Sequence, residues 1–268
     1  MRLDIYKSLW GMEGPVEAQL ARIKVAGYVG VEAPVAERPE EFATLLARYD
    51  LRYIAMIFTQ GANGAEHGAS YRRELARAVA AGPVKITAHS GRDSFSREEA
   101  LEFYAQCAAE EAKYAVPVGH ETHRGRVFFT PWTTAAVLRE CPALRLCCDF
   151  SHWCCVCESM LEAYAPEVAL AGSRAVHVHG RVGYEHGPQV TDPAAPEYAG
   201  HVARHEAWWQ AIWTAQRARG ETVATFTPEF GPPGYQHTLP YTRQPIADLW
   251  GMCGYMAQRT REQWAQRE

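Results

Sequence analysis

The 268-residue sequence has no long hydrophobic run and no excess of positive charge. No stretch approaches the ~18 consecutive apolar residues of a membrane span, and the first residues are not followed by the apolar core of a signal peptide. The formal net charge is −4, which creates no general attraction to a phosphate backbone. We therefore expect a soluble, cytoplasmic protein that binds neither nucleic acid nor a membrane.

The eight cysteines lack the spacing of a zinc site, although several are crowded into residues 147–157. A CxxC pair followed by a second pair, or by two spaced histidines, would predict zinc, but here two doublets are adjacent. We interpret them as small buried side chains rather than redox-active thiols, and expect no disulfides. The sequence also lacks a glycine-rich phosphate loop, so nothing in it indicates a phosphorylated substrate.

No linker, repeat or low-complexity segment divides the chain, which predicts a single domain over residues 1–268. Short β-rich segments alternate with longer helical segments along its whole length, which is the pattern of βαβ units. The expected helices include residues 97–114, beginning with a Ser96/Glu99 capping box, 158–171 and 205–219. The eight expected strands are residues 3–6, 29–33, 53–58, 84–89, 116–121, 144–149, 175–179 and 222–229.

Eight such units fit either a closed (β/α)8 barrel, which needs roughly 250 residues, or an open doubly wound sheet. Ionisable residues recur at the ends of most of the expected strands, and only a barrel brings many strand ends to one site, so we predict the (β/α)8 TIM barrel. One long connection, residues 181–204, follows the seventh strand. Its length and its polar and aromatic residues predict an ordered lid.

The last four strands end in residues that bind hard or borderline metal ions. Neighbouring strand ends lie roughly 5 Å apart, so Glu121, Asp149, Glu229 and one strand-7 histidine could surround a single divalent ion. Three carboxylates and one imidazole favour Mn²⁺, Mg²⁺ or Co²⁺, with Zn²⁺ as an alternative. His177 and His179 point to the same face, and His179, nearer the carboxyl end of the strand, is the favoured ligand.

Further polar residues close to these strand ends are candidates for binding a substrate. Asp149-x-x-His152 sets a carboxylate at a strand end and an imidazole on the following turn, where capping of a helix is the alternative role of the histidine. The residues expected to bind substrate are Glu32, His89, His123, Arg124, His177 and Arg181.

Five ordered segments carry a resemblance to a known family: GYVGVEA at residues 27–33, GHETH at 119–123, CDFSH at 148–152, VHVHGR at 176–181 and TPEF at 227–230. With them the chain resembles the xylose isomerase-like TIM-barrel superfamily, which includes sugar epimerases, sugar-phosphate isomerase/epimerase-like proteins, inosose dehydratase and endonuclease IV. The metal ligands of the family's ketose 3-epimerases fall on Glu121, Asp149, His179 and Glu229. A substrate-binding histidine corresponds to His152, and an arginine to Arg181.

The resemblance implies a divalent-metal-dependent isomerase or epimerase that acts on a sugar or related polyhydroxy carbonyl compound through an enediolate. Glu121 and Glu229 would transfer the proton on opposite faces of the substrate carbon, and His152 would bind the oxygen that develops charge. A dehydratase or lyase acting on an inosose-like substrate and a non-catalytic sugar-binding barrel are the alternatives. An endonuclease is disfavoured because the Asp-x-His pair expected after strand 7 is absent. Assembly into a homo-oligomer stays open.

Overall fold

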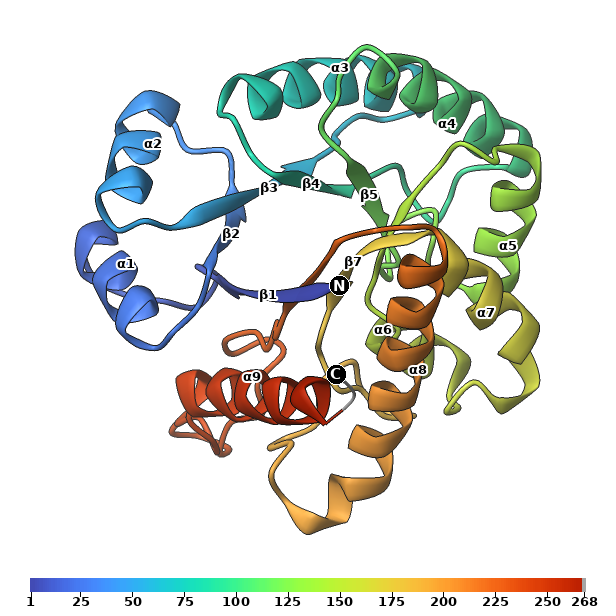
Figure 1. Cartoon of the computed structure of the whole chain (residues 1–268). Helices are drawn as coiled ribbons and strands as arrows, with labels where there is room; N and C mark the ends of the chain where they lie inside the picture. The colour runs from blue at the N-terminus through green and yellow to red at the C-terminus, as the bar shows by residue number, and fades with distance from the viewer. Residues whose placement is uncertain (267–268) are drawn as a thin grey trace.

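The computed structural model describes residues 1–266 and shows a closed barrel of eight parallel strands in chain order, surrounded by helices (Figure 1). The strands are β1 (Arg2–Ser8), β2 (Gly30–Pro34), β3 (Arg52–Phe58), β4 (Lys85–His89), β5 (Val118–Glu121), β6 (Leu146–Cys148), β7 (Ala175–His179) and β8 (Val223–Thr227). Each overlaps a strand expected from the sequence, and the predicted (β/α)8 barrel is confirmed.

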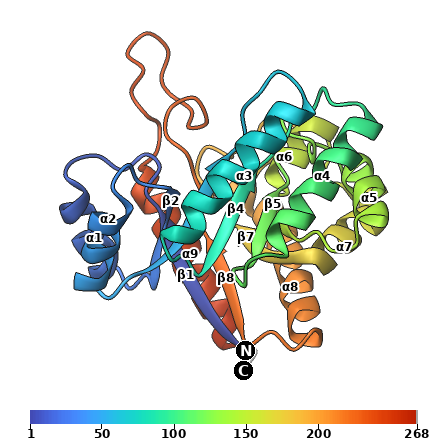
Figure 2. The same cartoon turned by 90° about the horizontal axis from the view of Figure 1, so that it is seen from above.

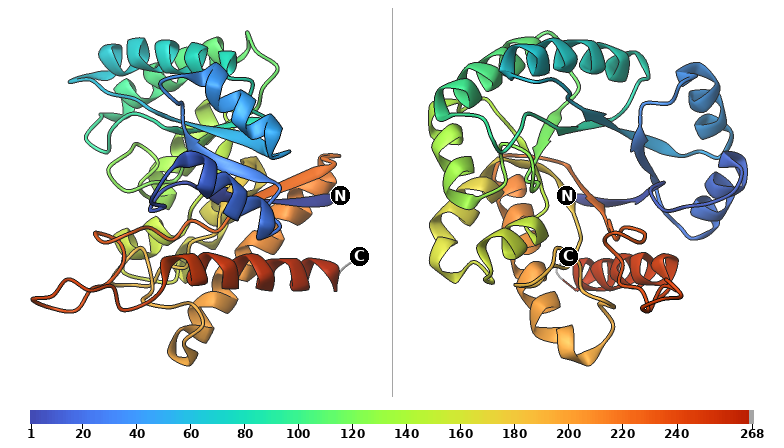
Figure 3. Two further views of the ribbon diagram at one scale, coloured as in Figure 1. Left: turned by 90° about the vertical axis from the view of Figure 1, so that its left-hand side faces the viewer. Right: turned by 180° about the vertical axis from the view of Figure 1, so that it is seen from behind.

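The helices form the outer layer of the barrel, as the views from the side and from behind also show (Figure 3). They are α1 (Val16–Val25), α2 (Pro39–Arg48), α3 (Gly64–Ala80), α4 (Arg97–Glu111), α5 (Pro131–Glu140), α6 (Ser151–Cys157), α7 (Ala165–Arg174), α8 (Ala199–Ala218) and α9 (Leu249–Ala265), with short 3₁₀ turns η1 (Glu162–Tyr164) and η2 (Pro196–Tyr198). Within residues 1–266, no helix has the length and apolarity needed to cross a membrane.

Two of the three helix predictions given above have wrong bounds. The helix expected over residues 158–171 begins only at Ala165, because Glu158 and Leu161 both adopt the left-handed conformation, which an α-helix does not contain. Two separate helices, α6 and α7, therefore flank this point. The helix expected from residue 205 begins earlier, at Ala199, so the last part of the long 181–204 connection is helical.

Side-chain caps begin several helices, as the sequence predicts for α4. The Ser96 hydroxyl accepts a hydrogen bond from the Glu99 amide at 3.1 Å. The predicted capping box is only half formed, however, because the Glu99 carboxylate accepts from the amide of Gly64 at 2.6 Å instead. Glu99 thereby connects the beginnings of α3 and α4.

The long connection after β7 packs against the connection after β8. The Gln189 side chain donates to the Gly231 carbonyl at 3.2 Å and accepts from the Gly231 amide at 2.7 Å. The Thr191 hydroxyl lies 2.7 Å from Nδ1 of His237. The β8–α9 connection projects beyond the other loops, at the end of the barrel opposite the N-terminus (Figure 2). The predicted action of residues 181–204 as a lid stays a prediction.

Candidate metal centre

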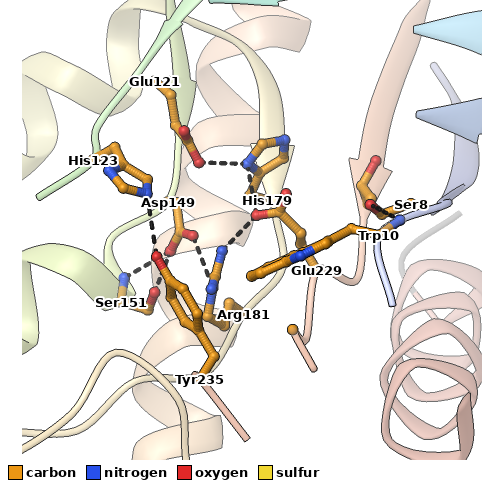
Figure 4. Close-up of polar contacts among 12 residues, drawn as sticks. Ser8, Trp10, Glu121, His123, Asp149, Ser151, His179, Arg181, Glu229 and Tyr235 are labelled. Atoms are coloured by element: carbon orange, nitrogen blue, oxygen red, sulfur yellow. Dashed lines mark hydrogen bonds and ion pairs between the residues drawn. The ribbon is translucent and has the colours of Figure 1, made fainter. Parts of the chain in front are cut away.

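Four side chains from consecutive strands meet at the carboxyl end of the barrel (Figure 4). Glu121 is the last residue of β5, Asp149 directly follows β6, His179 ends β7, and Glu229 lies two residues beyond β8. Each offers one oxygen or nitrogen, and these four atoms all lie within 4.8 Å of one another. All four side chains are buried. Two ligands on opposite sides of a divalent ion are separated by roughly 4 to 5 Å, so the spacing fits one ion.

His179 is held in this cluster from both of its ring nitrogens. Nδ1 lies 2.8 Å from a Glu121 oxygen and 3.1 Å from a Glu229 oxygen, whereas Nε2 lies 3.0 Å from Glu32. His177 lies one layer deeper, where its Nε2 is 3.1 Å from Glu32. The nitrogen of His179 that faces the cluster is therefore Nδ1, and Glu32 sets the orientation of the ring from behind.

Asp149 is held by the backbone and by the residues around it. Its amide donates to the Thr122 hydroxyl at 2.8 Å, and its Oδ1 accepts from the Ser151 amide at 3.0 Å and from the Ser151 hydroxyl. Burial raises the pKa of Asp149 to about 6, and the nearby Glu121 and Glu229 act in the same direction, while Arg181 opposes them. Three carboxylates so close together in a buried site favour a bound cation.

Arg181 supplies a positive charge inside the cluster. Its Nε donates to Asp149 at 3.1 Å and its Nη2 to Glu229 at 2.6 Å. The guanidinium is buried and lies over the ring of Tyr235, 4.6 Å from the ring centre. Arg181 thus pairs directly with two of the carboxylates, and its single positive charge offsets part of their negative charge.

Three histidines, His89, His123 and His152, surround the cluster, and two of them have ring nitrogens without a hydrogen-bond partner among the described residues. The rings of His123 and His152 lie 3.9 Å apart, and Tyr235 Oη is 3.3 Å from His123 Nε2. Burial lowers the pKa of His123 to about 4 and that of His152 well below its usual range, so both rings are neutral. Within residues 1–266, both nitrogens of His152 and Nε2 of His89 are buried without a hydrogen-bond partner. Buried polar atoms of this kind call for a ligand that supplies the missing partner.

A cavity of about 500 Å³ opens beside the cluster and is lined by a subset of the residues expected to bind substrate, namely His89, His123 and Arg181, together with Glu229. Glu32 and His177, also expected to bind substrate, contact each other beneath the cluster and do not line this cavity. Their role in substrate binding stays a prediction. Arg124 does not line it either, and lies 4.8 Å from the centre of the Tyr235 ring. His152 is enclosed between Asp149 and His123.

The sequence reasoning missed two residues that shape the site, Ser151 and Arg126. Ser151, inside the CDFSH segment, positions Asp149 by donating its amide to the carboxylate. An aspartate often accepts a hydrogen bond from the amide two residues later, so the spacing of these two residues could have predicted this contact. Arg126 lines the cavity and donates to the carbonyls of Thr59 and Gly91, at 3.1 and 3.2 Å. The contact of Tyr235 with His123 depends on the fold of the β8–α9 connection, and no local pattern indicates it.

A closed parallel barrel that gathers carboxylates and imidazoles at the carboxyl ends of its strands has the architecture of the TIM-barrel enzymes. The chain belongs to the xylose isomerase-like TIM barrel family, whose sequence model matches residues 20–213. The resemblance carried by the five sequence segments is thereby confirmed. No curated protein matches the sequence.

Solved structures with the same fold come from proteins of differing activity. They include 3-keto-D-glucoside 4-epimerase from E. coli, with a TM-score of 0.63, 13% identity, and coverage of 97% of this chain and 100% of that chain. An AP endonuclease of family 2 from Brucella melitensis has a TM-score of 0.62 at 14% identity, covering 95% and 98%. A probable 3-DHS dehydratase from Bacillus anthracis has a TM-score of 0.56 at 15% identity, covering 88% and 95%. At such identities the likeness is one of fold.

Proposed function

We propose that this protein is a divalent-metal-dependent isomerase or epimerase that acts on a sugar or related polyhydroxy carbonyl compound through an enediolate. The observation that carries the proposal is the buried cluster of Glu121, Asp149, His179 and Glu229 at the edge of a ligand-sized cavity. The family, and the unpartnered nitrogens of His152 beside the cluster, support it.

The four residues of the cluster would hold one ion, with Mn²⁺, Mg²⁺ or Co²⁺ favoured by the three carboxylate ligands. Such an ion, when bound, supplies Lewis-acid polarisation of a substrate carbonyl. His179 would contribute Nδ1, because its Nε2 already contacts Glu32. This division of the two nitrogens is typical of metal-binding histidines, whose second nitrogen is held by a carboxylate.

Glu121 and Glu229 would carry the proton in the reaction. One carboxylate removes the proton from the carbon next to the carbonyl, which leaves an enediolate, and the other returns a proton to the substrate. If the proton returns to the opposite face of the same carbon, the configuration of that carbon is inverted. If it returns to the neighbouring carbon, the carbonyl group moves to the carbon that lost its proton. His152, neutral and with free ring nitrogens, would hydrogen-bond the oxygen on which charge develops.

Metal content of the purified protein, measured by elemental mass spectrometry, tests the site. We expect about one equivalent of a divalent metal in the wild type and its loss in Glu121→Ala, Asp149→Ala, His179→Ala and Glu229→Ala. Glu111→Ala is the matched control, because Glu111 also contacts a histidine, His120, at 2.9 Å, but from helix α4 on the outside of the barrel. This control should keep its metal.

Conversion of ketoses and inososes by the metal-loaded protein tests the reaction, with products identified by mass spectrometry and NMR. An isomerase or epimerase conserves the substrate mass, whereas a dehydratase removes one water, so a product lighter by water would replace the proposal by a lyase. Full turnover in Glu121→Ala or Glu229→Ala would refute the two-carboxylate scheme. Binding of metal and sugar without any conversion would identify a sugar-binding barrel instead.

A further inference from the structure

The cavity beside the metal cluster has two chemically different sides. Its polar side is formed by residues of β4, β5, β7 and β8 and their following loops, among them His89, His123, Arg181 and Glu229. The opposite side is formed by residues at and beyond the ends of β1, β2 and β3. The apolar side chains there include Leu9, Trp10, Ala33, Phe42, Met56 and Phe58.

The apolar side reaches the polar groups at two aromatic contacts. Phe58 stacks on the ring of His89, with ring centres 4.3 Å apart and planes inclined by 11°. Trp10 meets Tyr235 edge-on at 5.1 Å, so an aromatic surface borders the cluster from two directions. Ala33 and Met56 are buried at the base of this side. None of the lining residues that β1, β2, β3 and their following helices contribute carries a charge.

Such a wall discriminates between the parts of a ligand. A hydroxyl group placed against it loses its hydrogen bonds to water without gaining a partner, whereas an apolar ring gains from leaving water. A free sugar carries a hydroxyl on almost every carbon and would set several of them against these side chains. The apolar side of the cavity therefore suits an apolar ring, whereas the metal cluster suits the hydroxyl and carbonyl oxygens of a sugar-like group.

We propose that the substrate of this site joins a polyhydroxy carbonyl part to an apolar, ring-sized group, and that the side chains at the ends of β1, β2 and β3 bind that group. This rests on the proposed function for the polyhydroxy part alone. The cavity volume of about 500 Å³ falls within the range of pockets that enclose ligands of this size. Rings of the substrate pack edge-on or offset against Phe58 and Trp10.

The first test uses the apolar group by itself. Binding of benzyl alcohol and of glycerol to the full-length protein is measured by ligand-observed NMR, in the wild type and in Ala36→Phe. Ala36 is a partly exposed residue that lines the apolar side, so the larger side chain fills the space. We expect benzyl alcohol to bind the wild type in preference to glycerol and to bind A36F at least about tenfold more weakly.

Val25→Phe is the matched control, because it adds a phenyl ring to α1 at a residue that is 90% exposed and does not line the cavity. Benzyl alcohol should bind V25F as it binds the wild type. Equal binding of benzyl alcohol to A36F and the wild type, or no binding to the wild type, overturns the proposal. If circular dichroism shows that A36F does not fold, the proposal is decided by whether the wild type binds benzyl alcohol in preference to glycerol.

The second test joins the apolar group to a polyhydroxy ring that has no carbonyl group, so it tests the recognition of the apolar group apart from the reaction. Phenyl β-D-glucoside and methyl β-D-glucoside differ only in the group next to the sugar, and we expect the phenyl compound to bind about 10- to 100-fold more tightly by calorimetry. Equal affinities would refute the joined substrate. A preference for the phenyl compound in a protein that binds no metal would retain the apolar side and refute the proposed reaction. One equivalent of bound metal without a preference for the phenyl compound would refute the apolar side and leave the proposed reaction standing.

Discussion

Replacement of Arg181 by methionine tests whether the buried guanidinium is the internal counter-charge of the carboxylate cluster. The side chain is buried and donates to Asp149 at 3.1 Å and to Glu229 at 2.6 Å. Removing one partner of a buried ion pair costs about 3 to 5 kcal/mol, because the other charge is left without compensation. Arg181→Met removes the shared partner of two carboxylates while keeping most of the side-chain volume.

We therefore expect Arg181→Met to lower the free energy of unfolding of the metal-free protein by about 3 to 5 kcal/mol. The measurement is urea unfolding in the presence of a chelator, followed by circular dichroism. Adding Mn²⁺ should narrow the gap between the variant and the wild type, because the ion supplies the missing positive charge. The difference in unfolding free energy between variant and wild type should also shrink as the pH falls. The folded-state pKa of Asp149, about 6, lies above its unfolded value, so protonation favours the folded state and removes a charge that Arg181 would otherwise compensate.

Arg126→Met is the matched control, since Arg126 lines the same cavity but donates to the main-chain carbonyls of Thr59 and Gly91. Arg126→Met should lower the free energy of unfolding by about 2 kcal/mol or less, and adding Mn²⁺ should not restore it. A loss below about 1 kcal/mol in Arg181→Met, or one equal to that of the control, would refute the role of Arg181 as counter-charge.

Three further predictions concern the support of the site and of the fold. Glu32→Gln should weaken metal binding by about 10- to 100-fold, because Glu32 holds Nε2 of His179 at 3.0 Å; unchanged affinity in a metal titration would contradict this. His205 is buried, and burial lowers its folded-state pKa to about 4, so its contribution to stability is present above its unfolded pKa of about 6.5 and is lost as the pH falls. Between pH 7 and pH 5 the free energy of unfolding, measured in urea, should therefore fall by about 2 kcal/mol more in the wild type than in His205→Gln, and equal falls would contradict this. Ser96→Ala should cost about 1 kcal/mol in urea unfolding, because the amide of Glu99 loses its cap, and an unchanged midpoint would show that solvent replaces the hydroxyl.

The barrel was predictable because its signals are local. Each strand is a short β-rich segment followed by a helical one, and eight such units in sequence can be read without any knowledge of contacts. One error fell where the backbone conformation interrupts the pattern, at Glu158 and Leu161, whose left-handed conformations keep the helix expected from residue 158 from beginning before Ala165. Neither residue is a glycine, so no composition signal marks the break.

The candidate ligands were predictable for a related reason. Parallel strands of a barrel place their carboxyl ends on one rim, so Glu121, Asp149 and Glu229 had to lie near one another once the strands were located. Alternation along β7 also put His177 and His179 on the same face, with His179 nearer the rim. The roles of these residues in binding and catalysis stay predictions.

The sequence by itself determined the order of strands and helices and the rim on which the acidic and imidazole groups gather, because these follow from periodicity and from the direction of parallel strands. It also indicated the family, through the resemblance of five short segments. Only the tertiary structure decided that Glu32 supports His179 from beneath, that Arg181 bridges two carboxylates, and that Phe58 stacks on His89 at the cavity. These depend on which side chains from distant segments meet across the barrel, and such long-range contacts leave no periodic signal along the chain.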